Sequence, residues 1–352
     1  MRKRYRLTGA LMAVIMTFGT VCGPVLAEEA QTPKVEVLEE QAEEAKAEEA
    51  PAEEAPGGWT PADPNDFSSP YRVEMDVPYL EDGSEFHLLD VFDATGKDTK
   101  EPLLIEIHGG GLIGGSKQTN LMHSDYYCRN GFKVLTPNYT LMPAGDYRTI
   151  VRDLFSMLAW TQEHADEYGY DLDHAFLSGD SAGGYIVTLL AAVLTNEELQ
   201  AYYEVEVPEK IHFCGFILTC PMADQEDLIR ALDGKEENFL NSMIFAPAIG
   251  EEILRDEDLM SHAILFNIIK PETFPEVYII TTPDGGDPYY RDAVMLKDYL
   301  EQNQIPFEYH EYSEVVHPLG HVFNIDNDKM DFLESRMAND QAIAYMLLRC
   351  KD

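Results

Sequence analysis

The stretch Phe176–Tyr185 constrains this chain more than any other part of its sequence. An apolar run leads into its centre, Gly-Asp-Ser-Ala-Gly at residues 179–183, and a second apolar run follows over residues 186–194. This pattern matches the G-x-S-x-G turn, in which a serine stands between a strand and a helix. Glycines are needed there because the flanking backbones approach closely, and the N-terminus of the helix can stabilise an anion at the serine. The stretch therefore predicts that Ser181 is a nucleophile, and the rest of the chain must supply its partners.

Strands and helices are expected to alternate along most of the chain. The expected strands are 71–78, 86–92, 103–107, 133–136, 175–177, 211–220, 277–282 and 307–312, and the expected helices are 122–130, 147–168, 186–194, 292–302 and 334–350. Almost continuously apolar strands, such as 211–220, belong inside a parallel sheet that is covered on both faces. The pattern predicts one α/β domain with a mainly parallel central sheet and helices on both of its faces.

Residues 222–271 interrupt this alternation. They combine charged runs with apolar stretches such as 241–245, and we expect them to be helical and irregular. Two interpretations stay open: a small helical lid inserted over the site, or one ordinary crossover helix with a surface loop.

The first 57 residues are predicted to lie outside the folded domain, which is then 58–352. Residues 1–27 have a basic start, an apolar stretch and a Val-Leu-Ala end, as is typical of an export signal. The alternative is an uncleaved membrane anchor. Residues 28–57 carry 11 Glu and 2 Lys and can bury no core, so we expect a disordered acidic spacer. The mature protein is expected at the cell surface or outside the cell, without a membrane span.

The chain is strongly acidic, with 25 Lys and Arg against 64 Asp and Glu and a net charge of −39. Such a charge disfavours nucleic acid and anionic membrane surfaces as partners, and it favours neutral substrates. The folded part contains four cysteines without Cys-x-x-Cys spacing, and we expect them to be buried free thiols, although an exported protein could pair some of them. No cluster of His, Cys and Asp shows the spacing of a metal site.

A glycine run, His108-Gly109-Gly110-Gly111, follows directly on the expected strand 103–107. Glycines leave backbone N–H groups unshielded, so an oxygen of a ligand can approach them closely. The run is not followed by Gly-Lys-Ser/Thr and does not fit G-x-G-x-x-G, which argues against a phosphate site. It is interpreted as an anion hole for the chemistry at Ser181.

A serine hydroxyl needs a base and an acid that orients the base. His321 is the preferred base because it lies in a loop just beyond the last expected strand, and His317 is the alternative. Asp287 is slightly preferred as the acid over Asp284, since it lies close before the next helix. The order serine, aspartate, histidine along the chain is that of the α/β-hydrolases.

These motifs together resemble the hormone-sensitive-lipase-like branch of the α/β-hydrolases, the acetyl esterase group. The resemblance rests on His108–Gly111, on residues 179–184, on the acid loop 287–292 and on His321-Val322-Phe323. The acid loop departs from the D-P-L-R-D pattern of the family, because Tyr289-Tyr290 stands where the family has one leucine. The resemblance implies that the N–H groups of Gly110, Gly111 and Ala182 form the oxyanion hole, and that no metal or cofactor takes part.

The expected activity is hydrolysis of short-chain acyl esters, acetyl or aryl, through Ser181, Asp287 and His321 and a covalent acyl-enzyme. The resemblance implies the preference for short acyl chains. The expected substrate is a small-molecule ester or an ester attached to a polysaccharide. The alternatives are a peptidase or amidase on the same fold and a non-catalytic binding module, which the intact serine, acid and histidine argue against. The sequence leaves the oligomeric state open.

Overall fold

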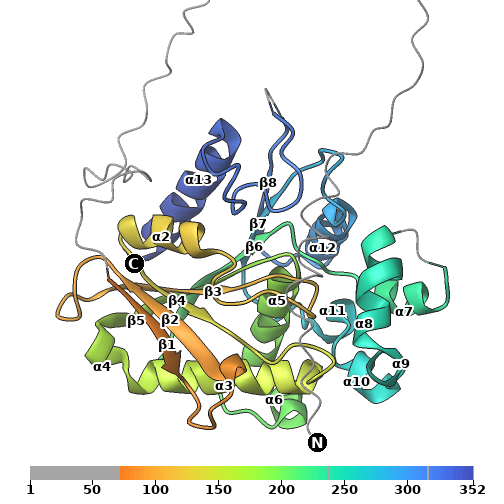
Figure 1. Cartoon of the computed structure of the whole chain (residues 1–352), viewed down its shortest axis with the longest axis horizontal. Coiled ribbons are helices and arrows are strands. Elements are labelled where there is room, and N and C mark those ends of the chain that lie inside the picture. Colours follow the sequence, from red (N-terminus) through yellow and green to blue (C-terminus); the bar gives the residue numbers. More distant parts are fainter. Residues whose placement is uncertain (1–71, 236–237, 315–316, 352) are drawn as a thin grey trace, which may run out of the picture. The chain divides into compact units, whose positions relative to one another are not determined.

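A twisted sheet runs through the fold, with helices packed around it (Figure 1). The computed structural model describes residues 72–235, 238–314 and 317–351, so the predicted export signal and spacer over residues 1–57 lie outside the described residues. Within the described residues the sheet has eight strands in the order β1-β2-β4-β3-β5-β6-β7-β8. The strands are β1 Arg72–Pro78, β2 Leu88–Asp93, β3 Glu101–Ile107, β4 Lys133–Pro137, β5 Tyr170–Asp180, β6 Phe213–Thr219, β7 Val277–Thr281 and β8 Phe307–Glu311.

The sheet is mainly parallel, as the sequence predicts. Strand β2 pairs antiparallel with both β1 and β4, and every pair from β4 through β3, β5, β6 and β7 to β8 is parallel. Parallel strands need crossover connections, and helices or helical segments fill them. The predicted site residues follow β3, β5, β7 and β8, and the carboxyl ends of these parallel strands lie at one edge of the sheet.

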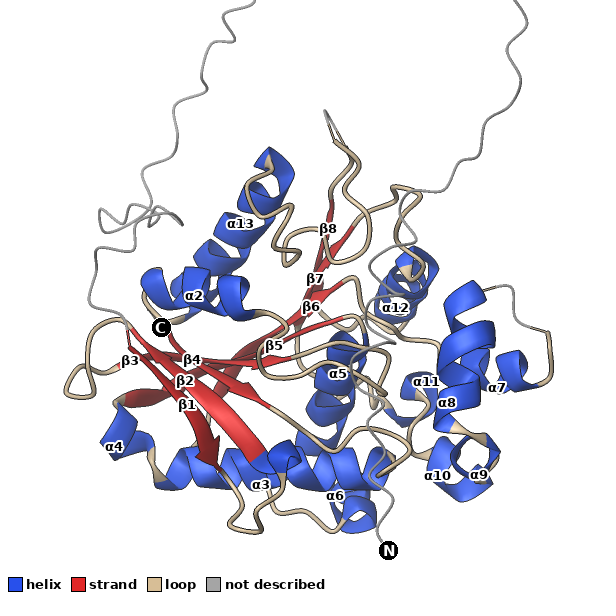
Figure 2. Cartoon of the chain, viewed as in Figure 1, coloured by secondary structure: helices blue, strands red, loops and turns tan. Residues whose placement is uncertain are grey.

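Helices cover both faces of the sheet. Figure 2 shows α2 and α13 on one side of the sheet and α3, α5 and α6 on the other. The longer helices are α2 Leu121–Arg129, α3 Tyr147–Glu163, α5 Ala182–Leu194, α6 Glu197–Tyr203, α12 Tyr290–Gln302 and α13 Leu333–Arg349. Helix α5 is buried over residues 182–193, so its apolar sequence reflects a helix that is enclosed on all sides. None of the helices in the described ranges combines the length and the apolar character needed to span a bilayer.

Three expected elements differ in detail from the structure, and the first is the strand expected over 175–177, which is only the middle part of β5. The helix expected over 147–168 divides at His164 into α3 and the short helix α4, Ala165–Tyr168, which ends at Gly169 in the left-handed conformation. Strand β2 begins at Leu88 because residues 85–87 form a 3₁₀ turn, η1, capped by the Ser84 side chain. The 3₁₀ turn follows from the local hydrogen bond of the Ser84 side chain, which the apolar pattern does not encode.

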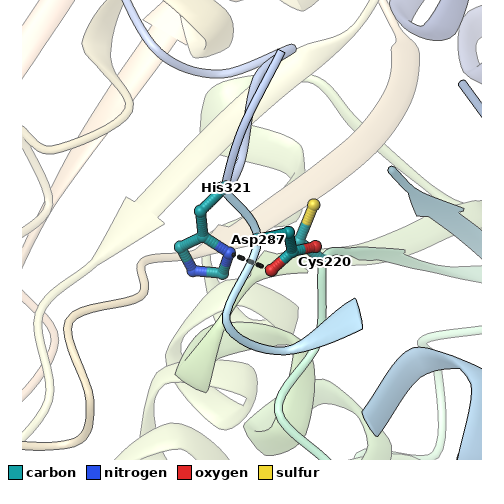
Figure 3. Close-up of side chains that lie close together, drawn as sticks. All are labelled: Cys220, Asp287 and His321. Atoms are coloured by element: carbon teal, nitrogen blue, oxygen red, sulfur yellow. Dashed lines mark hydrogen bonds and ion pairs between the residues drawn. The ribbon is translucent and has the colours of Figure 1, made fainter. Parts of the chain in front are cut away.

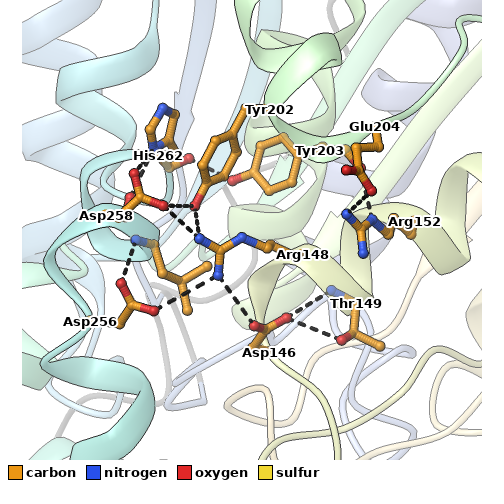
Figure 4. A network of polar contacts seen from close by, with 11 residues as sticks. Asp146, Arg148, Thr149, Arg152, Tyr202, Tyr203, Glu204, Asp256, Asp258 and His262 are labelled. Carbon is orange, nitrogen blue, oxygen red and sulfur yellow. Dashed lines mark hydrogen bonds and ion pairs between the residues drawn. The ribbon is translucent and has the colours of Figure 1, made fainter.

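The 222–271 segment consists of short helical pieces. They are α7 Glu226–Leu232, the π-helical turn η2 Asn241–Phe245, α8 Ala246–Ile249, α9 Glu251–Leu254, α10 Glu257–Ser261 and α11 Leu265–Ile268. A polar network ties α10 to the body of the fold (Figure 4). Arg148 of α3 donates to Asp258 at 2.7 Å and also contacts the Tyr202 hydroxyl of α6. The segment is thus helical and irregular, as expected, and its interpretation as a lid stays a prediction.

The four cysteines of the described residues are free thiols. Cys128 and Cys220 are buried, as expected, whereas Cys214 and Cys350 are only partly buried.

Candidate active site

Ser181 lies in a sharp turn between β5 and α5. Its backbone has φ 51° and ψ −118°, a conformation that is costly for a residue with a Cβ. The turn closes only around glycines: a Cβ at Gly183 would lie 2.1 Å from the carbonyl oxygen of Ile107, and one at Gly179 would lie 2.5 Å from the backbone of Gly183. The Ser181 N–H donates to the carbonyl oxygen of Thr219 at 2.9 Å, which fixes the turn to β6. The structure therefore holds Ser181 in the strained turn that the sequence predicts.

The glycine loop after β3 lies beside this turn. The Gly109 N–H donates to Asp180 Oδ1 at 2.9 Å, and a Cβ at Gly109 would lie 2.4 Å from Asp180 Oδ2. Gly110 and Gly111 have φ values of 120° and 63°, which favour glycine. Their N–H groups have no acceptor among residues 72–235, 238–314 and 317–351, so both donors are available to a bound oxygen.

Asp180 connects the glycine loop to the serine turn, a role that the sequence analysis missed. Besides the Gly109 N–H, its Oδ1 accepts a hydrogen bond from Asn120 Nδ2 at 2.7 Å. Burial raises the pKa of Asp180 above its usual range, and the hydrogen bond from Asn120 acts in the opposite direction. Asp180 could have been noticed as the variable residue of the Gly-Asp-Ser-Ala-Gly turn, whereas no sequence signal marks Asn120, which is 60 residues away.

The structure brings Asp287 and His321 together (Figure 3). His321 Nδ1 donates to Asp287 Oδ1 at 2.8 Å, and the side chain of Asp287 is buried while that of His321 is partly exposed. The Tyr289 N–H donates to the same oxygen at 2.9 Å, and the His321 N–H donates to the carbonyl oxygen of Gly286 at 3.3 Å. Because Nδ1 is engaged with the carboxylate, Nε2 is the ring nitrogen left for a reacting group.

Asp284, the alternative acid, and His317, the alternative base, contact other residues. Asp284 Oδ2 accepts from the Glu314 N–H at 2.8 Å, and the Asp284 carbonyl closes the turn before Asp287. The His317 ring stacks on Phe332 with centroids 4.7 Å apart. Neither residue takes part in the pair that Asp287 and His321 form. Within the described residues no hydrogen bond joins the Ser181 hydroxyl to His321, as is common in unliganded hydrolases, where such bonds tighten only with substrate.

Cys220 completes a cluster with these two residues. One ligand-type atom from each of Cys220, Asp287 and His321 lies within 4.8 Å of the others, so the three could be considered for a metal ion. Burial, followed by the charge of Asp287, raises the pKa of the Cys220 thiol well above its usual range. A metal would need the thiolate, and His321 Nδ1 already binds the carboxylate. The chemistry of these groups favours the hydrogen bond between Asp287 and His321 over a metal site.

The π-helical turn η2 lies within the segment that the sequence indicates as a possible lid, and it contacts both site loops. A Cβ on Gly111 would lie 2.2 Å from a ring atom of Phe245, so the ring packs directly on this glycine. The Tyr289 hydroxyl donates to Asn241 Oδ1 at 3.0 Å, and Asn238 Nδ2 donates to the carbonyl oxygen of Pro288 at 3.2 Å. The 222–271 segment therefore contacts the glycine loop through Phe245 and the acid loop through Asn241.

Comparisons with known proteins agree on one fold. A family model described as "alpha/beta hydrolase fold" matches residues 104–320. The acetyl esterase of Salmonella typhi is 24% identical over 225 residues, which cover 63% of this chain and 67% of that protein. The crystal structure of esterase B from Lactobacillus rhamnosis has a TM-score of 0.71 at 25% identity, over 80% of this chain and 86% of that one. Its complex with a tributyrin phosphonate inhibitor has a TM-score of 0.70 at 25% identity, with the same coverage.

Proposed function

The chain belongs to the alpha/beta hydrolases, in their hormone-sensitive-lipase-like and acetyl esterase branch, and from this membership we propose that it is a serine esterase for short-chain acyl esters. The observation that best supports the proposal is the 2.8 Å hydrogen bond between His321 and Asp287, at the same sheet edge as the strained Ser181 turn. The names of the similar proteins support ester hydrolysis, and the tributyrin phosphonate bound to esterase B supports short acyl chains.

The proposed reaction is a two-step acyl transfer. His321 Nε2 takes the proton of the Ser181 hydroxyl while the serine oxygen attacks the ester carbonyl. The tetrahedral oxyanion accepts hydrogen bonds from the N–H groups of Gly110, Gly111 and Ala182, and each such donor contributes about 2.7–4 kcal/mol in comparable sites. His321 then protonates the leaving alcohol, and the same base activates water to release the acid from Ser181. Asp287 keeps the imidazole oriented and stabilises its cationic form.

The 222–271 segment is proposed to be a lid that limits the acyl pocket. Phe245 packs on Gly111, one of the proposed oxyanion donors, so its ring stands next to the reacting carbonyl. A bulky side chain in this position leaves little room for a long acyl chain. This contact supports acetyl or other short esters as substrates.

The substrate is proposed to be met outside the cell. The basic and apolar sequence of residues 1–27 supports export, and the acidic surface supports a neutral ester, free or attached to a polysaccharide. N-terminal sequencing of the protein recovered from the medium and from the membrane fraction tests this part: cleavage after Ala27 agrees with it, whereas an intact N-terminus in the membrane fraction identifies an uncleaved anchor.

The activity is tested with the full chain on 4-nitrophenyl esters of increasing acyl length, on acetylated xylan and on a peptide anilide. We expect acetate and butyrate to be hydrolysed at least about tenfold faster than octanoate, and Ser181→Ala to remove this turnover. A fluorophosphonate probe should label the wild-type chain and not Ser181→Ala. Full activity in Ser181→Ala, or an anilide cleaved faster than every ester, would contradict the proposal.

A further inference from the structure

The backbone directly after the proposed base, His321, has an uncommon conformation. Val322 has φ 48°, which is costly for a β-branched residue. Such a conformation persists only where the surrounding structure fixes it. The N–H groups of Ile325 and Asp326 both donate to the carbonyl oxygen of Val322, at 2.9 and 3.0 Å, and close a turn behind the base. The placement of this turn in the fold depends on contacts with other elements.

Helix α13 supplies two side-chain donors to this turn. Ser335 Oγ donates to the carbonyl oxygen of Phe323 at 3.0 Å, and Asn339 Nδ2 donates to the carbonyl oxygen of Asn324 at 2.8 Å. In return, Asn339 Oδ1 accepts from Asn324 Nδ2 at 2.9 Å. All four residues are at most 1% exposed, so none of these bonds competes with water. Ser335 and Asn339 lie one turn apart on the same face of α13, and from there they hold two consecutive carbonyl groups of the turn.

The amide of Asn339 is itself fixed by a buried histidine of α2. His123 Nε2 lies 3.2 Å from Asn339 Oδ1, and since an amide oxygen only accepts, Nε2 is the donor. His123 Nδ1 lies 2.6 Å from Glu106 Oε1, and Ser124 Oγ donates to Glu106 Oε2 at 2.6 Å. Glu106 belongs to β3, the strand that leads into the glycine run at His108. Buried hydrogen bonds thus connect the turn behind the base with the strand before the proposed oxyanion hole.

We propose that Ser335 and Asn339 are positioning residues of the esterase: from one face of α13 they fix the carbonyl groups of Phe323 and Asn324, and so set the place of the His321 imidazole relative to Ser181. The inference rests on the proposed function of Ser181 and His321. Both residues act through the backbone of the turn, so their loss should misplace the base and leave substrate binding unchanged. A misplacement of about 1 Å can lower a rate about 100-fold.

The test compares the full chain with Ser335→Ala, which removes one hydroxyl, and Asn339→Leu, which keeps the approximate shape of the side chain. Asn130→Leu is the matched control, because Asn130 is also buried and its Nδ2 donates to the carbonyl oxygen of Tyr126 at 2.8 Å, at the end of α2. Hydrolysis of 4-nitrophenyl acetate gives kcat and KM, and thermal unfolding gives the stability. Hydrogen exchange, measured by NMR, follows the two amides that close the turn.

We expect kcat to fall about tenfold in Ser335→Ala and about 100-fold in Asn339→Leu, with KM within about twofold of the wild type in both. The two turn amides should exchange at least about tenfold faster in Asn339→Leu, because the turn opens more often without its anchor. Asn130→Leu should lose thermal stability as well, since it also removes a buried hydrogen bond, but it should keep the kcat and the exchange rates of the wild type.

A wild-type kcat in a folded Asn339→Leu chain would overturn the inference, as would an equal loss of kcat in Asn130→Leu or an effect on KM alone. Ser335→Ala, the smaller change, decides if Asn339→Leu does not fold. If the wild type hydrolyses no ester, the proposed function fails, and hydrogen exchange then decides separately whether α13 holds the turn: unchanged exchange of both amides in Asn339→Leu would refute it.

Discussion

The hydroxyl of Tyr289 donates a hydrogen bond to Asn241 Oδ1 at 3.0 Å and so connects the loop after β7 with the π-helical turn η2. The same residue donates its backbone N–H to Asp287, and its ring lies 5.5 Å from the ring of His321. Burial raises the pKa of the Tyr289 hydroxyl well above its usual range, so it stays a donor. The buried Tyr289 therefore contacts the proposed acid, the proposed base and the 222–271 segment.

Tyr289→Phe should loosen the 222–271 segment and leave the acid and base in place. The ring remains against His321, but the buried Asn241 loses its donor, so we expect the free energy of unfolding to fall by about 1–2 kcal/mol. Activity on longer acyl esters should rise relative to acetate, because Phe245 is carried by the same turn. Denaturant unfolding and the ester panel measure both effects. Tyr290→Phe is the control, since that hydroxyl contacts Glu311 at the surface, and an equal change there would contradict the prediction.

Gly111→Ala should disturb both the backbone and the contact with Phe245. The φ of 63° costs a residue with a Cβ about 1 kcal/mol, and the new methyl group would overlap the Phe245 ring. We expect esterase activity to fall at least about 100-fold, as when an oxyanion donor is lost. Adding Phe245→Ala should restore part of the stability, as thermal unfolding would show.

Gly83→Ala is the control that measures only the cost of a positive φ, because Gly83 has a φ of 76° with open space around it. If Gly111→Ala destabilises the chain no more than Gly83→Ala does, the contact with Phe245 is unimportant.

Ser181→Gly should stabilise the chain while removing turnover. Glycine adopts the φ of 51° without strain, so we expect the free energy of unfolding to rise by about 1 kcal/mol relative to Ser181→Ala. Both variants lack the nucleophile, so the difference between their free energies of unfolding measures the backbone strain at residue 181. Chemical denaturation measures it, and a Ser181→Gly chain less stable than Ser181→Ala would show that the turn is not strained.

His108 should make the fold sensitive to acid. Burial lowers the pKa of His108 from 6.5 to about 4, and the ring stacks on Tyr139. The stability contributed by neutral His108 is fully present above about pH 6.5 and is lost as the pH falls through about 4, by about 3 kcal/mol in total. The free energy of unfolding measured across this window should fall less steeply in His108→Asn. Equal slopes in the wild type and His108→Asn would refute the assignment.

Asp292 should make the fold less stable as the pH rises, the opposite of the effect of His108. Burial raises its pKa to about 6, although the N–H groups of Ala223 and Asp224 both donate to its Oδ2. Its stabilising contribution is therefore present below about pH 4 and is lost as the pH rises through about 6. Asp292→Asn keeps an oxygen for both donors and should raise the free energy of unfolding at neutral pH by about 1–3 kcal/mol. Asp298→Asn, at a half-exposed site on the same helix, should not; a decrease in Asp292→Asn would contradict the prediction.

The sequence was most informative about features that depend on interactions between near neighbours in the chain. Apolar runs and their turn residues predicted the strands and helices of the mainly parallel sheet, and most element ends agree with the structure within a few residues. The close approach around Gly183 was predicted from the turn motif, and a Cβ at this position would lie 2.1 Å from the carbonyl oxygen of Ile107. The break of the expected helix at His164 was missed, since the residues on both sides of it are helical.

The residues around the site show what sequence alone left open. Sequence spacing preferred Asp287 over Asp284 only slightly, and the bond to His321 depends on how the loop after β7 folds back over residues 317–321. Asn120 and Cys220 carried no signal at all, because each meets its neighbours across a gap of many residues in the chain. The stretch 241–245 was expected in a possible lid, but the partners of Asn241 and Phe245 were not predicted. Motif and periodicity fix the fold class and the position of Ser181 in its turn, since both act between near neighbours. The order of β5, β6 and β7 in the sheet decides which distant side chains meet at the strand ends, and that order exists only in the tertiary structure.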